Sequence, residues 1–277
     1  MAEDGGGPVR VEARGPVLLV TLDRPEKRNA VNPDVALGLD AAFNRLDDDP
    51  DLRAAVLAAE GSFFCAGSDL VEGAGPHTER GGQYGMIRRA RRKPLVVAVD
   101  GPALGGGFEM VLAADLVVAS RSAWFSLPET TRGRVPAAGG LFRGLDRLPP
   151  NVAAEMMLAG LRLSADRAHA LGLVNRVVEP GNALAEALVL ALETCAGAPA
   201  AVERAMRGLN EIRATAEATG WSVTEGAMKA MLVSPDRTEG NAAFVERRVP
   251  RWVPDEETRG AVLERSGDSE GMFRPRD

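Results

Sequence analysis

Three short apolar runs, at residues 54–58, 95–99 and 116–119, most strongly constrain what this chain can fold into. Each run is apolar at consecutive positions, which is typical of strands that are covered on both faces. Helix-like stretches at residues 33–46 and 108–114 precede or separate these runs. The alternation predicts a core built from β and α units.

Local signals mark where the first elements begin and end. The stretches at residues 9–12 and 17–22 flank a Gly-Pro pair, which predicts a hairpin. Asn32 is a suitable N-cap for the helix that follows. Pro33 would then occupy the first helical position, where no backbone N–H is needed.

The second half of the chain is dominated by helical signals. Segments such as residues 183–196 and 200–216 follow residue 151, and the remaining strand signal lies at residues 174–178. We therefore expect a core with the substrate site at residues 9–180 and a helical region at 181–252. A disordered N-terminal tail is expected at residues 1–8 and a polar C-terminal tail at 253–277.

Composition excludes several classes of protein. The chain has 277 residues, a net charge of −6 at pH 7, two cysteines and two histidines. No apolar run approaches the roughly 20 residues of a membrane helix, and no signal peptide is visible. We therefore expect a cytoplasmic protein without membrane insertion, and the acidic balance argues against nucleic-acid binding. The few cysteines and histidines argue against a disulfide framework, a zinc site and a Ser-His-Asp triad, which leaves carboxylates for acid–base chemistry.

A glycine run at residues 105–107 is the first candidate for chemistry. It follows a buried strand and opens a helix, so it can present backbone N–H groups and the positive end of a helix dipole to an anion. The pattern lacks the third glycine of a dinucleotide fingerprint and the Gly-Lys-Ser/Thr of a P-loop. The alternative is a tight turn that packs a helix on a sheet.

A second stretch of small residues, at 62–70, also follows a strand and can aim N–H groups into a cleft. Two such loops that converge would form an oxyanion hole. Cys65 and Ser68 lie in this stretch, but Ser68 lacks the nucleophile-elbow pattern and Cys65 follows two phenylalanines. A buried small residue is therefore the favoured interpretation of the cysteine.

Two glutamates could form an acid–base pair. Glu129 follows Glu109 by twenty residues, a separation that suits two carboxylates converging from successive β and α units. Such a pair could share a water molecule, one side chain removing a proton while the other supplies one. Individually, Glu109 could simply favour a helix dipole, and Glu129 could be a surface acid after a proline.

In this order, the three segments resemble the enoyl-CoA hydratase, or crotonase, superfamily. The resemblance is carried by residues 64–70 (Phe-Cys-Ala-Gly-Ser-Asp-Leu), residues 103–109 (Ala-Leu-Gly-Gly-Gly-Phe-Glu) and residues 127–129 (Leu-Pro-Glu) with the pair at 139–140. It extends to residues 22–25, 29–30, 93–94, 171–178 and 239–244. It covers roughly residues 9–252, and it is more specific for the superfamily than for one reaction.

This resemblance implies an α/β protein of the ClpP/crotonase fold, with twisted sheets of repeated ββα units. The helical C-terminal region would form trimers, often paired into hexamers. The implied reaction is hydration of a 2-enoyl-CoA to a 3-hydroxyacyl-CoA, without a metal and without a cofactor, because coenzyme A is part of the substrate. Alternatives are an isomerase or a carnitinyl-CoA or crotonobetainyl-CoA type of enzyme on the same site, or a non-catalytic relative that binds a CoA thioester or RNA.

The resemblance also assigns residues. The backbone N–H groups of Ser68 and Gly106 would hold the thioester oxygen, Glu109 would activate water, and Glu129 would deliver a proton to the α-carbon. The substrate would be contacted by Lys27, Arg28, Ala30, Ala66, Ser68, Asp69, Leu70 and Gly106.

Three further features stay open from the sequence. The basic run at residues 88–93 is interpreted as a solvated helix face. The glycine-rich segment at 71–85 suggests a mobile wall over the acyl pocket, with His77 exposed in it. Arg132 and Arg134 could recognise a polar or anionic acyl tail, pair with nearby acids, or face solvent.

Overall fold

A six-stranded sheet forms the centre of the molecule, for which a computed structural model describes residues 7–255. Its order is β1 (Val9–Arg14), β2 (Val17–Leu22), β3 (Ala54–Ala59), β4 (Leu95–Val99), β6 (Leu116–Ser120) and β9 (Arg176–Val178). The β1–β2 pair is the predicted antiparallel hairpin, and the other neighbours pair in parallel. Most of each predicted tail, residues 1–6 and 256–277, lies outside the described residues.

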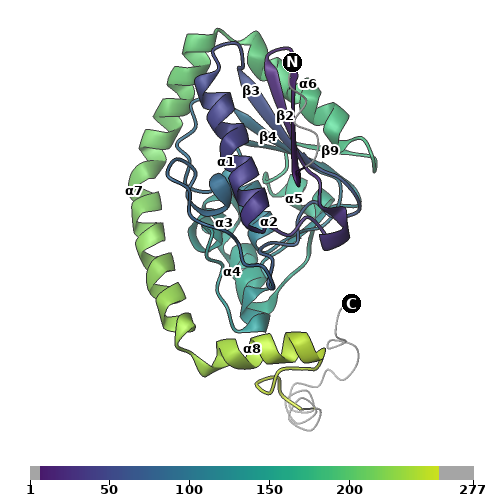
Figure 1. Ribbon diagram of the computed structural model, residues 1–277, viewed down its shortest axis with the longest axis vertical. Coiled ribbons are helices and arrows are strands. Elements are labelled where there is room, and N and C mark those ends of the chain that lie inside the picture. Colours follow the sequence, from purple (N-terminus) through teal and green to yellow (C-terminus); the bar gives the residue numbers. More distant parts are fainter. Residues whose placement is uncertain (1–6, 256–277) are drawn as a thin grey trace.

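Both faces of the sheet are covered, as the continuous apolar runs predict. Alternate residues of β2 divide between two apolar clusters, Leu18 and Val20 on one face and Val17 and Leu19 on the other. The first cluster includes the buried side of α1 (Pro33–Asp48), and the second includes α6 (Ala183–Ala196). Figure 1 shows the sheet lying between these helices.

The start of α1 follows its sequence signal. The Asn32 side chain accepts a hydrogen bond from the backbone N–H of Val35, and Pro33 occupies the first turn. The remaining helices of the core are α2 (Gly106–Ala113), α3 (Gly140–Arg147), α4 (Pro150–Ala159) and α5 (Ala165–Ala170). Short 3₁₀ turns lie at η1 (Pro25–Lys27), η2 (Gln83–Gly85) and η3 (Glu129–Arg132).

A small second sheet joins the segments that carry the two candidate glutamates. It consists of β5 (Ala103–Leu104), β7 (Trp124–Ser126) and β8 (Leu163–Ser164). β5 leads directly into α2, and β7 leads into η3. Leu104 pairs with Ser126 in parallel register, and the backbone N–H of Gly105 donates to the carbonyl of Ser126 at 2.9 Å. The start of α2 and the start of η3 are thereby held at one edge.

The C-terminal helices are α6, α7 (Pro199–Leu232) and α8 (Pro235–Glu246). Figure 1 shows α7 running along one side of the molecule and α8 crossing its end. The helix predicted at residues 200–216 is therefore too short. The helix continues through Gly220, where an added Cβ would lie 2.3 Å from the Phe142 ring. Packing against α3 thus outweighs the low helix propensity of glycine at that position.

The prediction of a solvated helix face at residues 88–93 is wrong. Arg89 is 2% exposed and pairs with Asp40 at 2.7 Å and with Asp47 at 2.9 Å. Arg91 is also buried and pairs with Asp115. These residues form turns between η2 and β4 rather than a helix, because their guanidinium groups anchor this segment to α1 and to the end of α2.

Within residues 7–255, no single helix is long and apolar enough to cross a membrane. The helices α6 and α7 taken together have the length and the composition of a membrane-spanning segment, but the chain bends by 105° between them.

Candidate active site

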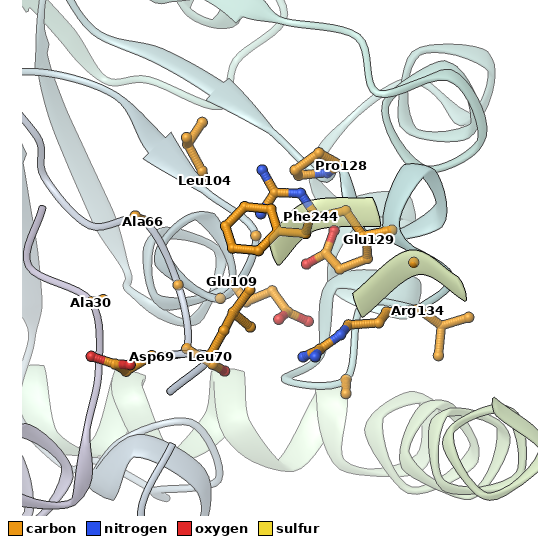
Figure 2. A pocket seen from close by; sticks show the side chains of 18 of the residues that line it. Ala30, Ala66, Asp69, Leu70, Leu104, Glu109, Pro128, Glu129, Arg134 and Phe244 are labelled. Atoms are coloured by element: carbon orange, nitrogen blue, oxygen red, sulfur yellow. The ribbon is translucent and has the colours of Figure 1, made fainter. Parts of the chain in front are cut away.

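A cavity of about 500 Å³ opens beside the start of α2. Its walls come from the loop at residues 66–71, from α2 and η3, and from the C-terminal end of α7 with α8 (Figure 2). Every residue assigned to the site from the sequence lines this cavity: Lys27, Arg28, Ala30, Ala66, Ser68, Asp69, Leu70, Gly106, Glu109 and Glu129. The fold therefore gathers these separate segments in one place.

The two small-residue loops converge on one wall of the cavity. The backbone N–H of Leu104 donates to the Cys65 carbonyl at 2.9 Å. Gly67, at φ +89°, approaches so closely that an added Cβ would lie 2.9 Å from the Gly106 nitrogen. Among the hydrogen bonds of the described residues, none uses the backbone N–H of Ser68 or Gly106. Two backbone donors near each other are thus left without a partner among the described residues.

Gly106 is required by close packing rather than by its backbone angles. A Cβ at this position would lie 2.2 Å from the hydroxyl oxygen of Tyr84. Tyr84 is fully buried in η2, and its hydroxyl lies 2.7 Å from the Ser68 hydroxyl. The tyrosine therefore packs against both candidate N–H donor residues and lines the cavity with them, a role that sequence reasoning missed because nothing in its local pattern marks it.

Glu109 lies in the first turn of α2 and is 2% exposed. Its Oε1 atom accepts hydrogen bonds from the backbone N–H groups of Ala138 and Gly140, at 2.7 and 2.8 Å. Burial raises the pKa of Glu109 to about 7, and the two hydrogen bonds and the charge of Arg143 oppose this shift. One oxygen of the carboxyl group is thus fixed by the fold.

Glu129 begins η3 and lines the same cavity. Its Oε2 atom is buried and has no hydrogen-bond partner among the described residues. Burial, followed by the nearby Glu109 carboxyl group, raises the pKa of Glu129 to about 8, although Arg132 and Arg134 act in the opposite direction. In Figure 2 the Glu109 and Glu129 side chains are directed into the same space.

The arrangement can hold one proton between two carboxyl groups. Two buried carboxylates that repel each other do not both ionise readily, so the pair titrates as a unit near neutral pH. A proton donor and a proton acceptor can therefore coexist in this cavity, beside two N–H groups that can stabilise a negative oxygen.

The side chains of Asp69, Cys65 and His77 are not available for chemistry in this cavity. The Asp69 carboxylate pairs with Arg24 at 2.7 Å and accepts hydrogen bonds from the backbone N–H groups of Val71 and Glu72. Its side chain is therefore engaged in shaping the loop. Burial raises the pKa of the Cys65 thiol to about 12, which agrees with the interpretation of Cys65 as a buried small residue. His77 is exposed and does not belong to the cavity lining.

Sequence reasoning missed the contribution of α8. Arg237, Asn241 and Phe244 line the cavity from this helix, together with Met228 and Met231 near the end of α7. The available signal was the family-like pattern at residues 239–244, which indicates a motif but not its contact with η3. More than 100 residues separate η3 from α8 in the sequence, so the local pattern does not indicate that the two segments meet.

Comparison with known proteins agrees with these features. The sequence model of the family described as Enoyl-CoA hydratase/isomerase matches residues 12–255. Mevalonyl-coenzyme A hydratase of Aspergillus fumigatus is 40% identical over 86% of this chain and 92% of its own length. Carnitinyl-CoA dehydratase of Proteus mirabilis is 39% identical over 88% of this chain and 97% of its own length.

The fold agrees as well. The solved structure of a carnitinyl-CoA dehydratase from Mycobacterium avium superposes with a TM-score of 0.85 at 41% identity, covering 90% of this chain and 100% of that one. Both the crotonase-type fold and the resemblance carried by the three motifs are confirmed. The chain belongs to the enoyl-CoA hydratase/isomerase family.

Proposed function

We propose that this protein adds water to the double bond of a 2-enoyl-CoA and releases a 3-hydroxyacyl-CoA. The observation that carries the proposal is the pair Glu109 and Glu129, which line one cavity together with Ser68 and Gly106, whose backbone N–H groups have no hydrogen-bond partner within residues 7–255. The relatives named as hydratases and dehydratases support water addition or removal on such a site.

The thioester oxygen would lie between the two backbone donors. As water attacks the β-carbon, negative charge moves through the double bond to this oxygen and forms an enolate. The N–H groups of Ser68 and Gly106 stabilise that charge, and the loss of one such donor typically costs about 3 to 4 kcal/mol in the transition state. The backbone, rather than the Ser68 hydroxyl, carries out this step.

The hydrogen bonds of the two glutamates support a different role for each. Two backbone N–H groups stabilise the ionised form of Glu109, so Glu109 is the base that removes a proton from water. Glu129 has a buried oxygen without a donor and lies next to that negative charge, so it retains the proton. Glu129 then delivers this proton to the α-carbon. Transfer of a proton from Glu109 back to Glu129, directly or through solvent, restores the starting state.

The coenzyme A part of the substrate would enter past Lys27 and Arg28. Both residues line the cavity beside the loop at residues 66–71. Their positive charges suit the phosphates of coenzyme A. The reaction needs no further cofactor, because the thioester itself accepts the electrons of the double bond.

We also propose a homotrimer or a homohexamer. The helix α7 buries few of its residues within the chain, namely Met206, Gly220 and Thr224. Apolar side chains along it stay exposed, including Leu209, Ile212 and Val223, which are 47%, 80% and 60% exposed. A second chain packed against this helix would remove that apolar surface from water.

The direct test is a panel of 2-enoyl-CoA thioesters incubated with the purified protein, with products separated by chromatography. A 3-hydroxyacyl-CoA supports hydration, and a shifted double bond would instead support the isomerase alternative. Tight binding of the thioesters without any product would favour a non-catalytic relative and contradict the proposal.

A further inference from the structure

The helix α8 docks on the turn that carries Glu129 through two glycines. A Cβ on Gly133 would lie 2.2 Å from the carbonyl oxygen of Asp236, and a Cβ on Gly240 would lie 2.2 Å from the carbonyl oxygen of Arg132. The two backbones therefore touch. This contact brings Arg132 and Arg134 of the turn together with Arg237 of the helix, and all three line the cavity.

These three arginines form no ion pair with an acid in the part of the chain that the structure describes. Among the ion pairs of the described residues, none involves Arg132, Arg134 or Arg237. Arg134 donates to the Asn241 side chain at 2.7 Å, and the Arg132 guanidinium lies 5.0 Å from the centre of the Phe244 ring. Both partners are uncharged. By contrast, Arg89 and Arg91 in the core each have a carboxylate.

The cluster therefore concentrates positive charge that no ion pair within residues 7–255 compensates. Burial lowers the pKa of Arg134, and the charges of Arg237 and Arg132 lower it further. Gathering like charges at a cavity wall is unfavourable without an anion. The Glu129 carboxyl group interacts electrostatically with Arg132 and Arg134, but it forms no ion pair with either of them, and one carboxyl group cannot balance three guanidinium groups.

We propose that the acyl chain of the substrate ends in an anionic group, a carboxylate, which Arg132, Arg134 and Arg237 bind. This inference rests on the hydratase function proposed above. A guanidinium group holds a carboxylate through two parallel hydrogen bonds, and Arg134 has donors left after its bond to Asn241. The same charges disfavour an acyl chain that ends in a quaternary ammonium.

The position of the cluster separates it from the expected coenzyme A end. With the thioester oxygen at Ser68 and Gly106, the β-carbon must face the glutamates. Figure 2 shows Arg134 directed into the cavity beside Glu129, whereas Ala30, Asp69 and Leu70 lie on the other side. The acyl chain would therefore run past Glu129 toward the arginines, while the nucleotide lies near Lys27 and Arg28. The phosphates of coenzyme A are the competing source of negative charge.

The test compares thioesters that differ only at the far end of the acyl chain. Three series of 2-enoyl-CoA compounds with five to eight acyl carbons would end in a carboxylate, a methyl group or a trimethylammonium group. We expect the best carboxylate compound to exceed its methyl counterpart in kcat/KM by about 10- to 100-fold, the range for charge-assisted hydrogen bonds. The trimethylammonium compounds should fall below both.

Variants that remove one positive charge show which arginines cause the preference for a carboxylate. Arg134→Gln and Arg237→Gln should each lower the carboxylate-to-methyl ratio of kcat/KM by about tenfold. Arg167→Gln, an exposed arginine on α5 outside the cavity lining, removes the same charge and should keep the wild-type ratio. Affinities of the same thioesters for the Glu109→Gln protein, measured by calorimetry, would show the preference without turnover.

The outcomes are distinct. Hydration of methyl-ended thioesters with a carboxylate-to-methyl ratio near or below one would overturn the anionic acyl chain and leave the hydratase function intact. If Arg134→Gln weakens binding of free coenzyme A and of both thioesters equally, the arginines bind the phosphates and the inference is wrong. Failure to hydrate any of the series would instead contradict the proposed function.

Discussion

The hydroxyl oxygen of Tyr84 lies 2.7 Å from the hydroxyl oxygen of Ser68, beside Gly106 in the lining of the cavity. Burial raises the pKa of Tyr84 well above its usual range, so its proton stays on the ring oxygen. The Ser68 hydroxyl is thus occupied by a neutral partner. This relationship separates the side chain of Ser68 from the chemistry proposed for its backbone.

Ser68→Ala should therefore retain a turnover within a few-fold of wild type, because its backbone N–H remains. Gly106→Ala and Gly106→Pro form a matched pair, since both place a Cβ 2.2 Å from the Tyr84 hydroxyl but only proline removes the N–H. We expect proline to be the slower of the two by about 100- to 1,000-fold in kcat. Circular dichroism checks that each variant folds. A folded Ser68→Ala protein that binds thioester but has lost nearly all turnover would contradict the role of the backbone.

Glu109→Gln and Glu129→Gln should each lower kcat by about 10²- to 10⁴-fold, because each removes a proton acceptor or donor. Both changes are nearly isosteric. The amide oxygen of glutamine at position 109 can still accept the hydrogen bonds from Ala138 and Gly140, so folding should persist. Steady-state hydration assays measure the effect. Near-normal turnover in either folded variant would remove that residue from the mechanism.

The glutamate pair should also make stability depend on pH. The folded-state pKa values, about 7 for Glu109 and about 8 for Glu129, lie above the value of 4.5 expected in the unfolded chain. Above that value the unfolded chain releases protons that the folded protein still holds, so the contribution of the pair to stability is lost as the pH rises. The free energy of unfolding of wild type relative to the Glu109→Gln/Glu129→Gln protein should fall between about pH 4.5 and pH 8.

Urea unfolding of both proteins across this pH range measures the difference, and using the double variant as the reference removes the contributions of all other groups. A difference that is flat with pH would show that the two carboxyl groups are not perturbed in the folded state.

Arg89→Met should lower the free energy of unfolding by about 3 to 5 kcal/mol, because it removes the buried guanidinium that joins the partly buried Asp40 to the buried Asp47. Arg89 is 2% exposed and bridges Asp40 and Asp47 on α1. Arg10→Met is the matched control, since Arg10 pairs with Asp23 at 2.8 Å but is 46% exposed, and its loss should cost less than about 1 kcal/mol. If chemical denaturation showed equal losses of unfolding free energy for the two variants, the distinction between the buried and the exposed ion pair would be contradicted.

Light scattering on the purified protein should give a mass of three or six times the 29.2 kDa of one chain. The expected assembly follows from the exposed apolar side chains of α7 and from the family resemblance. A charged substitution at Ile212, which is 80% exposed, should shift the mass toward that of one chain. A clean monomer of the wild-type protein at working concentration would count against the proposed assembly.

The sequence by itself determined the elements whose signals are local. The strand at residues 95–99 is an uninterrupted apolar run, and the start of α1 depends on Asn32 and Pro33, which act within a single turn. The motifs around Ser68 and Gly106 were equally visible, because the close approach of two loops requires small residues in a short stretch.

Tertiary structure alone decided which charges are buried and which remain free. Arg89 and Arg134 are both arginines near other arginines in the sequence, yet one is buried between two aspartates and the other faces a cavity beside uncharged partners. The difference arises from α1, which supplies acids to Arg89, and from α8, which meets η3 through Gly133 and Gly240. Such contacts join residues about 40 to more than 100 positions apart, so no local period or spacing can encode them.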